Sequence, residues 1–166
     1  MKCPGWRMAA RAILLASTLA SCCPREPVDA VTEPFPESQK AVERALLDLL
    51  GAAERKDMVR LEAMHLYGPK FSKFGDTQAP LRLDAEATRR TERAWIESVA
   101  AFRPGVEDLK VDVFGRTAVA TFVMPYEVVA EGQTVRARLR ATLVWVEVDS
   151  GWKVAHEHFS PLPPKP

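Results

Sequence analysis

The chain has 166 residues, and its 23 lysines and arginines against 22 aspartates and glutamates give a formal net charge of +1. This balance argues against nucleic acid as a partner, because nucleic-acid binding calls for a clustered positive surface. The three cysteines all lie near the amino terminus, as Cys3, Cys22 and Cys23. They cannot close a loop within a later domain, and no Cys/His cluster has the spacing of zinc ligands. We therefore expect no metal and no cofactor.

The amino-terminal segment predicts export. Three basic residues, Lys2, Arg7 and Arg11, precede an apolar run over residues 12–20. That run is too short for a membrane-spanning helix, which needs ~20 residues, and it is typical of a cleaved signal peptide. The run ends in Leu19-Ala20-Ser21-Cys22, which resembles the lipobox of bacterial lipoproteins. The resemblance implies cleavage before Cys22 and attachment of a diacylglycerol to its thiol; ordinary secretion, with Cys22 as a free or disulfide-bonded thiol, is the alternative.

Three segments follow from this reading. Residues 1–21 are the lipoprotein signal peptide, residues 22–36 a proline-rich linker with little apolar content, and residues 37–162 one domain. The linker cannot bury enough apolar surface to fold, so it predicts a solvated spacer between lipid and domain. Cys23, rather than an aspartate, follows Cys22. By the sorting rule of enteric bacteria this resembles an outer-membrane lipoprotein, so we expect the chain in the bacterial cell envelope, lipid-anchored to the outer membrane and facing the periplasm.

The first half of the domain predicts helices. Ser38 can cap a helix that runs to about residue 55, with apolar residues at helical spacing. Asp57 can cap a second, short helix, which Gly68-Pro69 ends. Residues 67–75 are aromatic and turn-rich and predict a short strand or an ordered loop. Asp84 can cap a third helix to about Phe102.

From residue 106 onward the apolar residues alternate, which predicts strands. Turns at residues 115–116, 131–133 and 149–151 divide the segment into strands joined by hairpins. Consecutive hairpins form an antiparallel sheet, and helices grouped ahead of such a sheet indicate an α+β layer.

The segment Asp149-x-Gly151-Trp152-Lys153-Val154-x-His156-x-His158-x-Ser160, preceded by Thr142-x-Val144-Trp145, carries a family resemblance over residues 38–161. It is similar to the nuclear transport factor 2-like superfamily, and within it to SnoaL-like domains and the association domain of calcium/calmodulin-dependent protein kinase. The resemblance implies a cone-shaped roll in which the amino-terminal helices pack on a strongly bent antiparallel sheet. The family includes isomerases, cyclases and dehydratases, and many members that only bind or assemble, so the fold alone does not assign a function.

In the register of that family, Glu157 and Phe159 face into the cone. The kinase association domain carries arginines at the positions of Leu143 and Phe159, and their apolar replacements favour a hydrophobic ligand. The candidate pocket-lining residues are Trp95, Phe71, Phe74, Leu139, Leu143, Trp145 and Phe159. Glu157 is the candidate general acid or base, since desolvation would raise the pKa of a carboxyl in an apolar cone. Tyr126 could donate a hydrogen bond to a developing oxyanion if it points inward. Glu157 as a salt-bridge partner is the alternative.

Other polar residues of the sheet have a structural explanation. His156 and His158 share one strand face, so joint metal ligation is geometrically possible, but no third ligand is evident and we expect both to pack on the outer face of the sheet. Arg136, Arg138 and Arg140 predict a solvated face paired with acidic neighbours, and anion binding is the alternative. An apolar patch continues that face at Thr142, Val144, Val146 and Val148, and it predicts a homodimer through the outer sheet face.

The sequence thus predicts a membrane-anchored, exported domain that binds a small apolar ligand or mediates assembly, without a committed catalytic set. The alternative is an isomerase, cyclase or dehydratase that uses Glu157 as its general base. Whether the chain is an enzyme stays open at this point.

Overall fold

The computed structural model describes residues 29–75 and 81–163. The predicted signal peptide, Cys22 and the first part of the predicted linker lie outside these residues. Among the described residues, no helix is long and apolar enough to cross a membrane. The chain forms, in order, α1 (Pro36–Glu54), α2 (Met58–Ala63), β1 (Ser72–Phe74), α3 (Ala85–Ser98), β2 (Ala101–Pro104), β3 (Glu107–Phe114), β4 (Thr117–Ala130), β5 (Gln133–Val148) and β6 (Gly151–Pro161). Helices therefore precede a strand-rich half, as the sequence predicts.

The three predicted helices form, with one cap and one boundary different from the prediction. Asp57 accepts a hydrogen bond from the backbone N–H of Arg60 at 3.0 Å, and Asp84 accepts one from Ala87 at 2.8 Å, so both predicted caps are confirmed. The predicted cap at Ser38 is wrong: α1 begins at Pro36, whose fixed φ suits a first helical turn, and Ser38 lies inside the helix.

The third helix ends four residues earlier than predicted. Val99 is extended, with φ −92° and ψ 146°, and the backbone N–H of Ala100 already donates to Val129 at 2.7 Å. Phe102 therefore belongs to β2 and lies opposite Val128 of β4. Pairing with the edge of β4 satisfies the backbone groups that a longer helix would have used, and it outweighs the local helical pattern.

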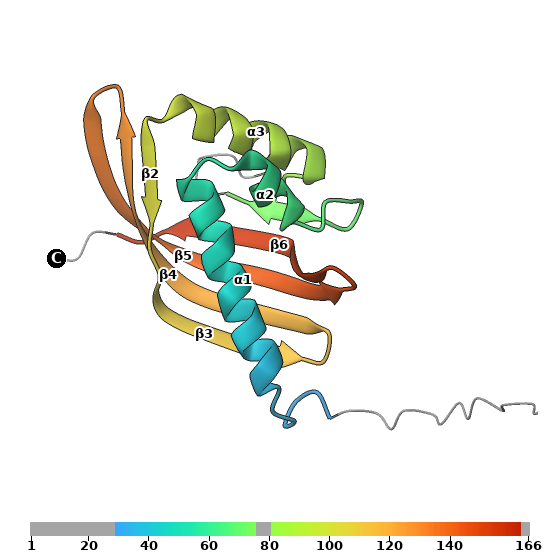
Figure 1. The fold of residues 1–166 in the computed structure, drawn as a ribbon. Helices are drawn as coiled ribbons and strands as arrows, with labels where there is room; N and C mark the ends of the chain where they lie inside the picture. Colours follow the sequence, from blue (N-terminus) through green and yellow to red (C-terminus); the bar gives the residue numbers. More distant parts are fainter. Residues whose placement is uncertain (1–28, 76–80, 164–166) are drawn as a thin grey trace, which may run out of the picture.

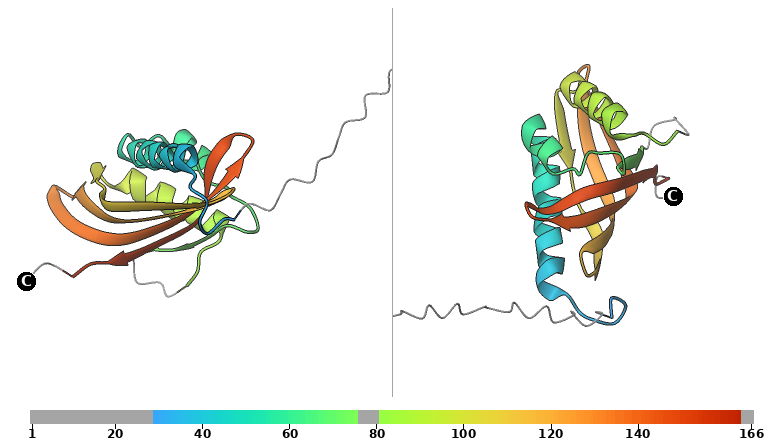
Figure 2. Two further views of the ribbon diagram at one scale, coloured as in Figure 1. Left: turned by 90° about the horizontal axis from the view of Figure 1, so that it is seen from below. Right: turned by 90° about the vertical axis from the view of Figure 1, so that its right-hand side faces the viewer.

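The strands form one six-stranded sheet in the order β1-β6-β5-β4-β2, with β3 also paired to β4. The sheet is strongly bent and curves around the helices, giving the predicted α+β cone (Figures 1 and 2). It is mixed rather than wholly antiparallel, because β1 runs parallel to β6. The segment between α2 and α3 thus contributes an edge strand beside the last strand of the chain.

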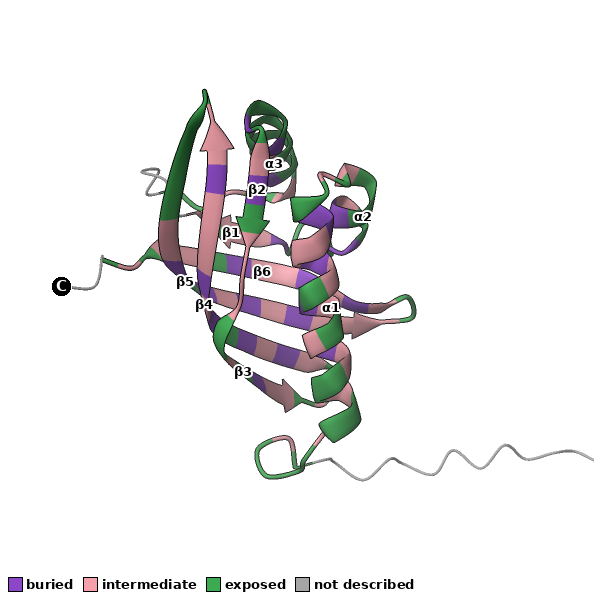
Figure 3. Ribbon diagram, turned by 60° about the vertical axis from the view of Figure 1, so that its left-hand side comes forward, coloured by how far each residue is buried: buried purple, intermediate pink, exposed green. Residues whose placement is uncertain are grey.

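Apolar side chains from α1 and from alternate positions of β4 and β5 form the core. Figure 3 shows the alternation of buried and less buried positions along these strands. Val42 and Leu46 of α1, and Leu143 and Trp145 of β5, are at most 1% exposed. The buried polar side chains of the described residues, His65, Thr88 and Glu157, come from the end of α2, from α3 and from β6. We call the end of the cone where α3 and β2 lie beside the tips of β4 and β5 its wide end (Figure 1).

Candidate functional site

A break in the alternation of side-chain direction along β6 places both Val154 and Glu157 on the inner face of the sheet. Val154 lies opposite Trp145, whereas His156 lies opposite Val144, so Ala155 is an extra residue in a β-bulge. Leu143 and Trp145 share the inner face of β5, so their partners Glu157 and Val154 face inward together. Strict alternation along the strand would instead put Val154 on the same face as His156. The bulge turns Glu157 into the cone without exposing Val154.

The parallel pairing of β1 adds a cation beside Glu157. Lys73 lies opposite Glu157, and Ser72 and Phe74 lie opposite His156 and His158. Directly opposite residues in a sheet point to the same face, so Lys73 points inward. The Lys73 ammonium lies 2.9 Å from Glu157 Oε2.

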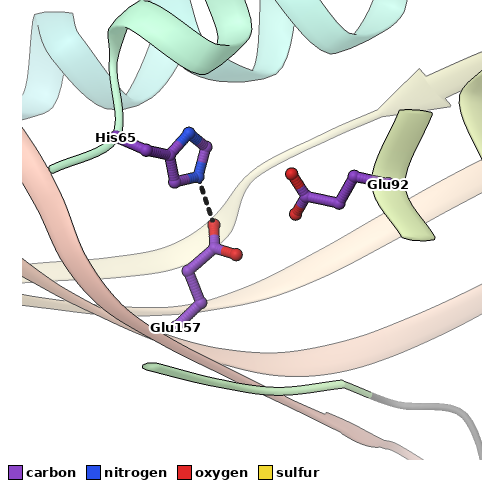
Figure 4. A group of neighbouring side chains, drawn as sticks. All are labelled: His65, Glu92 and Glu157. Atoms are coloured by element: carbon purple, nitrogen blue, oxygen red, sulfur yellow. Dashed lines mark hydrogen bonds and ion pairs between the residues drawn. The ribbon is translucent and has the colours of Figure 1, made fainter. Parts of the chain in front are cut away.

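His65 approaches Glu157 from the other side, from the bridge that follows α2 (Figure 4). Its Nε2 lies 3.1 Å from Glu157 Oε1, and its Nδ1 lies 2.8 Å from the carbonyl oxygen of Leu61. Both ring nitrogens thus face acceptors, which is the arrangement an imidazolium satisfies with two donated hydrogen bonds. Burial lowers the pKa of His65, but the carboxylate of Glu157 outweighs it, and the pKa is raised overall.

Glu92 of α3 completes the network above Lys73. The Lys73 ammonium bonds to Glu92 Oε1, and the hydroxyl of Tyr67 donates to Glu92 Oε2 at 3.1 Å. The Tyr67 ring stacks on His65 with centroids 4.8 Å apart. Burial, followed by the negative charges of Glu92 and Glu157, raises the pKa of Tyr67, so its phenol stays protonated as a donor. We call His65, Tyr67, Lys73, Glu92 and Glu157 the buried network.

The pKa of Glu157 is lowered, whereas the sequence analysis predicts that burial raises it. Desolvation raises it, but the nearby charges of Lys73 and His65, together with their hydrogen bonds, lower it well below its usual range. The same attraction raises the pKa of Lys73 against the effect of burial. Glu157 is therefore a stable anion between two cations, which makes it a weak proton acceptor.

The side chains of the buried network include a potential set of metal ligands. One ligand atom from each of His65, Glu92 and Glu157 falls within a 4.8 Å cluster. However, the Lys73 ammonium contacts both carboxylates and so supplies the positive charge that a metal ion would bring. When His65 is protonated, its imidazolium and the Lys73 ammonium balance the two carboxylates of the buried network.

Most of the other predicted site residues lie around the buried network or in the core. Leu139, Leu143, Trp145 and Phe71 are buried, and Phe159 is half-buried with its ring 5.1 Å from the Lys73 ammonium. Phe74 instead lies on the outer face, in edge contact with His156 and His158, so it does not line the interior. His156 also bonds through Nδ1 to Ser72 Oγ at 2.9 Å, as expected for a packed outer-face histidine.

Tyr126 and Trp95 lie apart from the buried network, at the wide end of the cone. Trp95 contacts Phe102 edge-on with centroids 4.9 Å apart, and Phe102 contacts Tyr126 at 6.0 Å. The two residues proposed for joint catalysis, Glu157 and Tyr126, therefore belong to different clusters. Tyr67, which sequence reasoning missed, is the tyrosine that joins the buried network.

Sequence reasoning also missed His65, Lys73 and Glu92. Glu92 lies in a polar stretch of α3 where a charged residue carries no signal. Lys73 lies in an aromatic, turn-rich segment that could face either way, and only the pairing of β1 with β6 turns it inward. His65 gave a weak signal, because it is a single polar residue between Met64 and Leu66 at the end of a short helix.

Comparison with known proteins supports the fold assignment. A family model for the SnoaL-like domain matches residues 42–164. No curated protein is significantly similar to this chain. Among solved structures, a candidate dehydratase of the nuclear transport factor 2-like family from Streptomyces avermitilis is 22% identical, with 78% of this chain and 99% of that chain covered and a TM-score of 0.71. A nuclear transport factor 2-like protein from Salmonella enterica is 17% identical, with 78% and 95% covered and a TM-score of 0.69.

A candidate calcium/calmodulin-dependent protein kinase II association domain from Xanthomonas campestris is 16% identical, with 75% of this chain and 88% of that chain covered and a TM-score of 0.63. At these identities the structures share the fold and need not share an activity. The family model covers most of the described domain, from the first buried turn of α1 to the end of β6. This chain therefore belongs to the SnoaL-like family, within the nuclear transport factor 2-like fold.

Proposed function

We propose that this protein is an exported, lipid-anchored binding domain that takes a small, mostly apolar ligand at the wide end of its cone. The proposal rests on one observation: both carboxylate oxygens of Glu157 already have partners within the protein. Its two carboxylate oxygens face His65 at 3.1 Å and Lys73 at 2.9 Å. A carboxylate held in this way stabilises the fold and is a poor proton acceptor for a substrate.

Apolar side chains at the wide end support a ligand of low polarity. Trp95 of α3 is 41% exposed although it packs against Phe102, and Val135 at the tip of β5 is 56% exposed. Tyr126 and Val128 line the same face of β4, since they alternate with the outward Glu127. Accessible aromatic and aliphatic side chains on a concave face are typical of ligand sites.

The second candidate function is proton-transfer catalysis of the isomerase, cyclase or dehydratase type. The His65–Glu157 pair favours it, because a histidine oriented by a carboxylate is a common acid–base unit, and one structural neighbour is named as a candidate dehydratase. Against it, both nitrogens of His65 already face protein acceptors, and its side chain is 1% exposed. Such an enzyme would have to open the buried network to reach its substrate.

Native mass spectrometry of the mature protein, purified in detergent from a bacterial host without added ligand, tests the binding function. We expect an added mass of a few hundred daltons that is lost on collisional heating and whose identity is an apolar compound. A Trp95→Ala variant should lose the added mass, while Phe114→Ala, which removes an exposed aromatic residue from β3, should keep it. Absence of any bound molecule in the wild type would count against the proposal.

The same spectra test the proposed homodimer. Val144 and Val146 of β5 lie opposite Val119 and Thr117 of β4 on the outer face, and all four are half-buried in the single chain. A partner copy would cover this apolar patch. A mass of one chain at all protein concentrations would contradict the dimer without affecting the proposed ligand.

The lipid anchor is proposed from the Leu19-Ala20-Ser21-Cys22 segment and the proline-rich linker. We expect Cys22→Ala to move the protein from the membrane fraction to the soluble fraction or to leave the precursor uncleaved. Cys23→Ala is the matched control, since it removes the neighbouring thiol and should stay in the membrane fraction. Immunoblots of fractionated cells measure both, and membrane retention of correctly cleaved Cys22→Ala would contradict lipidation.

A further inference from the structure

A hollow of about 700 Å³ lies away from the buried network, where β2, β4 and β5 meet Leu162 and Pro163, the residues that follow β6. The backbone N–H of Leu162 donates to the carbonyl oxygen of Arg138 at 2.9 Å, which holds the segment after β6 beside β5 (Figure 1). Arg103, Glu127, Arg136 and Arg138 contribute to its lining together with Tyr126 and Leu162. This volume is within the usual range of small-molecule sites.

The charged residues of the hollow form a row across three strands. Arg103 of β2 lies opposite Glu127 of β4, which in turn lies opposite Arg136 of β5. Glu127 bonds to Arg103 at 2.5 Å through Oε1 and pairs with Arg136 at 2.6 Å through Oε2. The central carboxylate thus orders two guanidinium groups side by side.

The two arginines retain hydrogen-bonding capacity. A guanidinium has five N–H donors, and the side chains of Arg103 and Arg136 are 56% and 77% exposed. The lining residues include three arginines, Arg103, Arg136 and Arg138, but only one carboxylate, that of Glu127. Arg138 pairs with Glu107, which does not line the hollow. The hollow therefore has a surplus of positive charge. Contacts with Glu127 hold the guanidinium groups of Arg103 and Arg136 in position.

The remaining lining is apolar. Pro104 and Pro125 join Tyr126 and Leu162 around the arginine row. Flat apolar surface next to a pair of guanidinium groups matches a compound with a carboxylate at one end and an apolar body at the other, because arginine binds carboxylates through two parallel hydrogen bonds.

We propose that this hollow is a second binding site, which takes a small amphipathic monoanion such as an aromatic carboxylate. Arg103 and Arg136 receive the carboxylate, and Pro125 with Leu162 contacts the apolar body. The site is separate from the proposed ligand at the wide end of the cone, and its failure or success does not depend on that proposal.

Isothermal titration of the mature protein in neutral phosphatidylcholine nanodiscs with 2-naphthoate tests the site, with empty nanodiscs as the reference. We expect a dissociation constant below about 1 mM and no saturable heat with 2-naphthylmethanol, which has the same rings without the charge. Arg136→Ala and Arg103→Ala should each weaken binding about tenfold, the loss expected for one charge-assisted contact.

Arg140→Ala is the matched control, since Arg140 lies further along β5, bonds to the carbonyl oxygen of Pro161 at 3.4 Å and does not line the hollow. It should bind 2-naphthoate as the wild type does. Equal weakening by Arg140→Ala would show general charge attraction, and equal binding of 2-naphthylmethanol would show apolar adsorption. Either result would overturn the proposal, as would the absence of saturable heat with 2-naphthoate.

Discussion

Replacing Glu157 with glutamine is expected to lower the free energy of unfolding by about 3–5 kcal/mol, the usual cost of removing one partner from a buried ion pair. Glutamine keeps the size of the side chain but leaves Lys73 and His65 without their shared negative charge. Chemical denaturation followed by tryptophan fluorescence measures the change. A variant as stable as the wild type would show that the buried network does not hold the cone together.

Glu127→Gln is the matched control for this experiment. Glu127 also binds two cations, Arg103 and Arg136, but it lies at the surface, where ion pairs contribute little to stability. We expect its loss to change stability far less than the loss of Glu157 does, because solvent screens exposed ion pairs. The comparison separates the effect of burial from the number of ionic partners.

The pH dependence of stability tests the lowered pKa of Glu157 independently. Its pKa is lower in the folded protein than the ordinary value of 4.5, so its contribution is fully present above pH 4.5 and is lost as the pH falls through the folded pKa. The wild type should therefore lose stability on acidification below pH 4.5 more steeply than Glu157→Gln. Parallel curves for the two proteins would contradict the lowered pKa.

Replacing Lys73 with alanine is expected to have a similarly large effect, about 3–5 kcal/mol in buffer with a metal chelator. The change leaves Glu92 and Glu157 close together with only His65 as a counter-charge. It also frees the space between three groups whose ligand atoms fall within a 4.8 Å cluster. A histidine nitrogen and two carboxylates are a common zinc ligand set.

Zinc should therefore restore part of the stability that Lys73→Ala loses. A ligand at 100 times its dissociation constant stabilises a folded protein by about 2.7 kcal/mol, which thermal unfolding with and without Zn²⁺ would detect. The wild type should not respond, since its own ammonium occupies the position. Lys73→Ala/His65→Gln should lose the response as well. A zinc effect of equal size in all three proteins would show binding elsewhere.

For Glu157, the position in the fold could be predicted from the sequence, but the pKa could not. The position of Glu157 in the last strand, and its direction into the cone, follow from the motif around Gly151-Trp152 and its family register. Its pKa does not, because it depends on Lys73 and His65, which lie 84 and 92 residues earlier in the chain. Local patterns carry no information about which distant cation meets a buried carboxylate.

The boundary of α3 and the placement of Phe74 have the same explanation. The helical pattern continues to Phe102, yet residues from Ala100 onward form hydrogen bonds with β4, which no local signal reports. Phe74 belongs to an aromatic, turn-rich segment that could face either way. The parallel pairing of β1 with β6 sets its direction outward and that of Lys73 inward.

By itself, the sequence determined the three helices, the strand-rich second half and the α+β class, since caps, turns and apolar periodicity act over a few residues. The cone shape of the fold was implied by the family resemblance. Leu139, Leu143 and Trp145 of β5, which the sequence analysis predicts as pocket-lining residues, lie in the core. Only the tertiary structure decided which cations meet Glu157, because the parallel addition of β1 turns Lys73 inward and the bridge between His65 and Val154 brings the imidazole to the carboxylate through long-range pairing. Those two features convert a candidate catalytic glutamate into the centre of a buried ion-pair network.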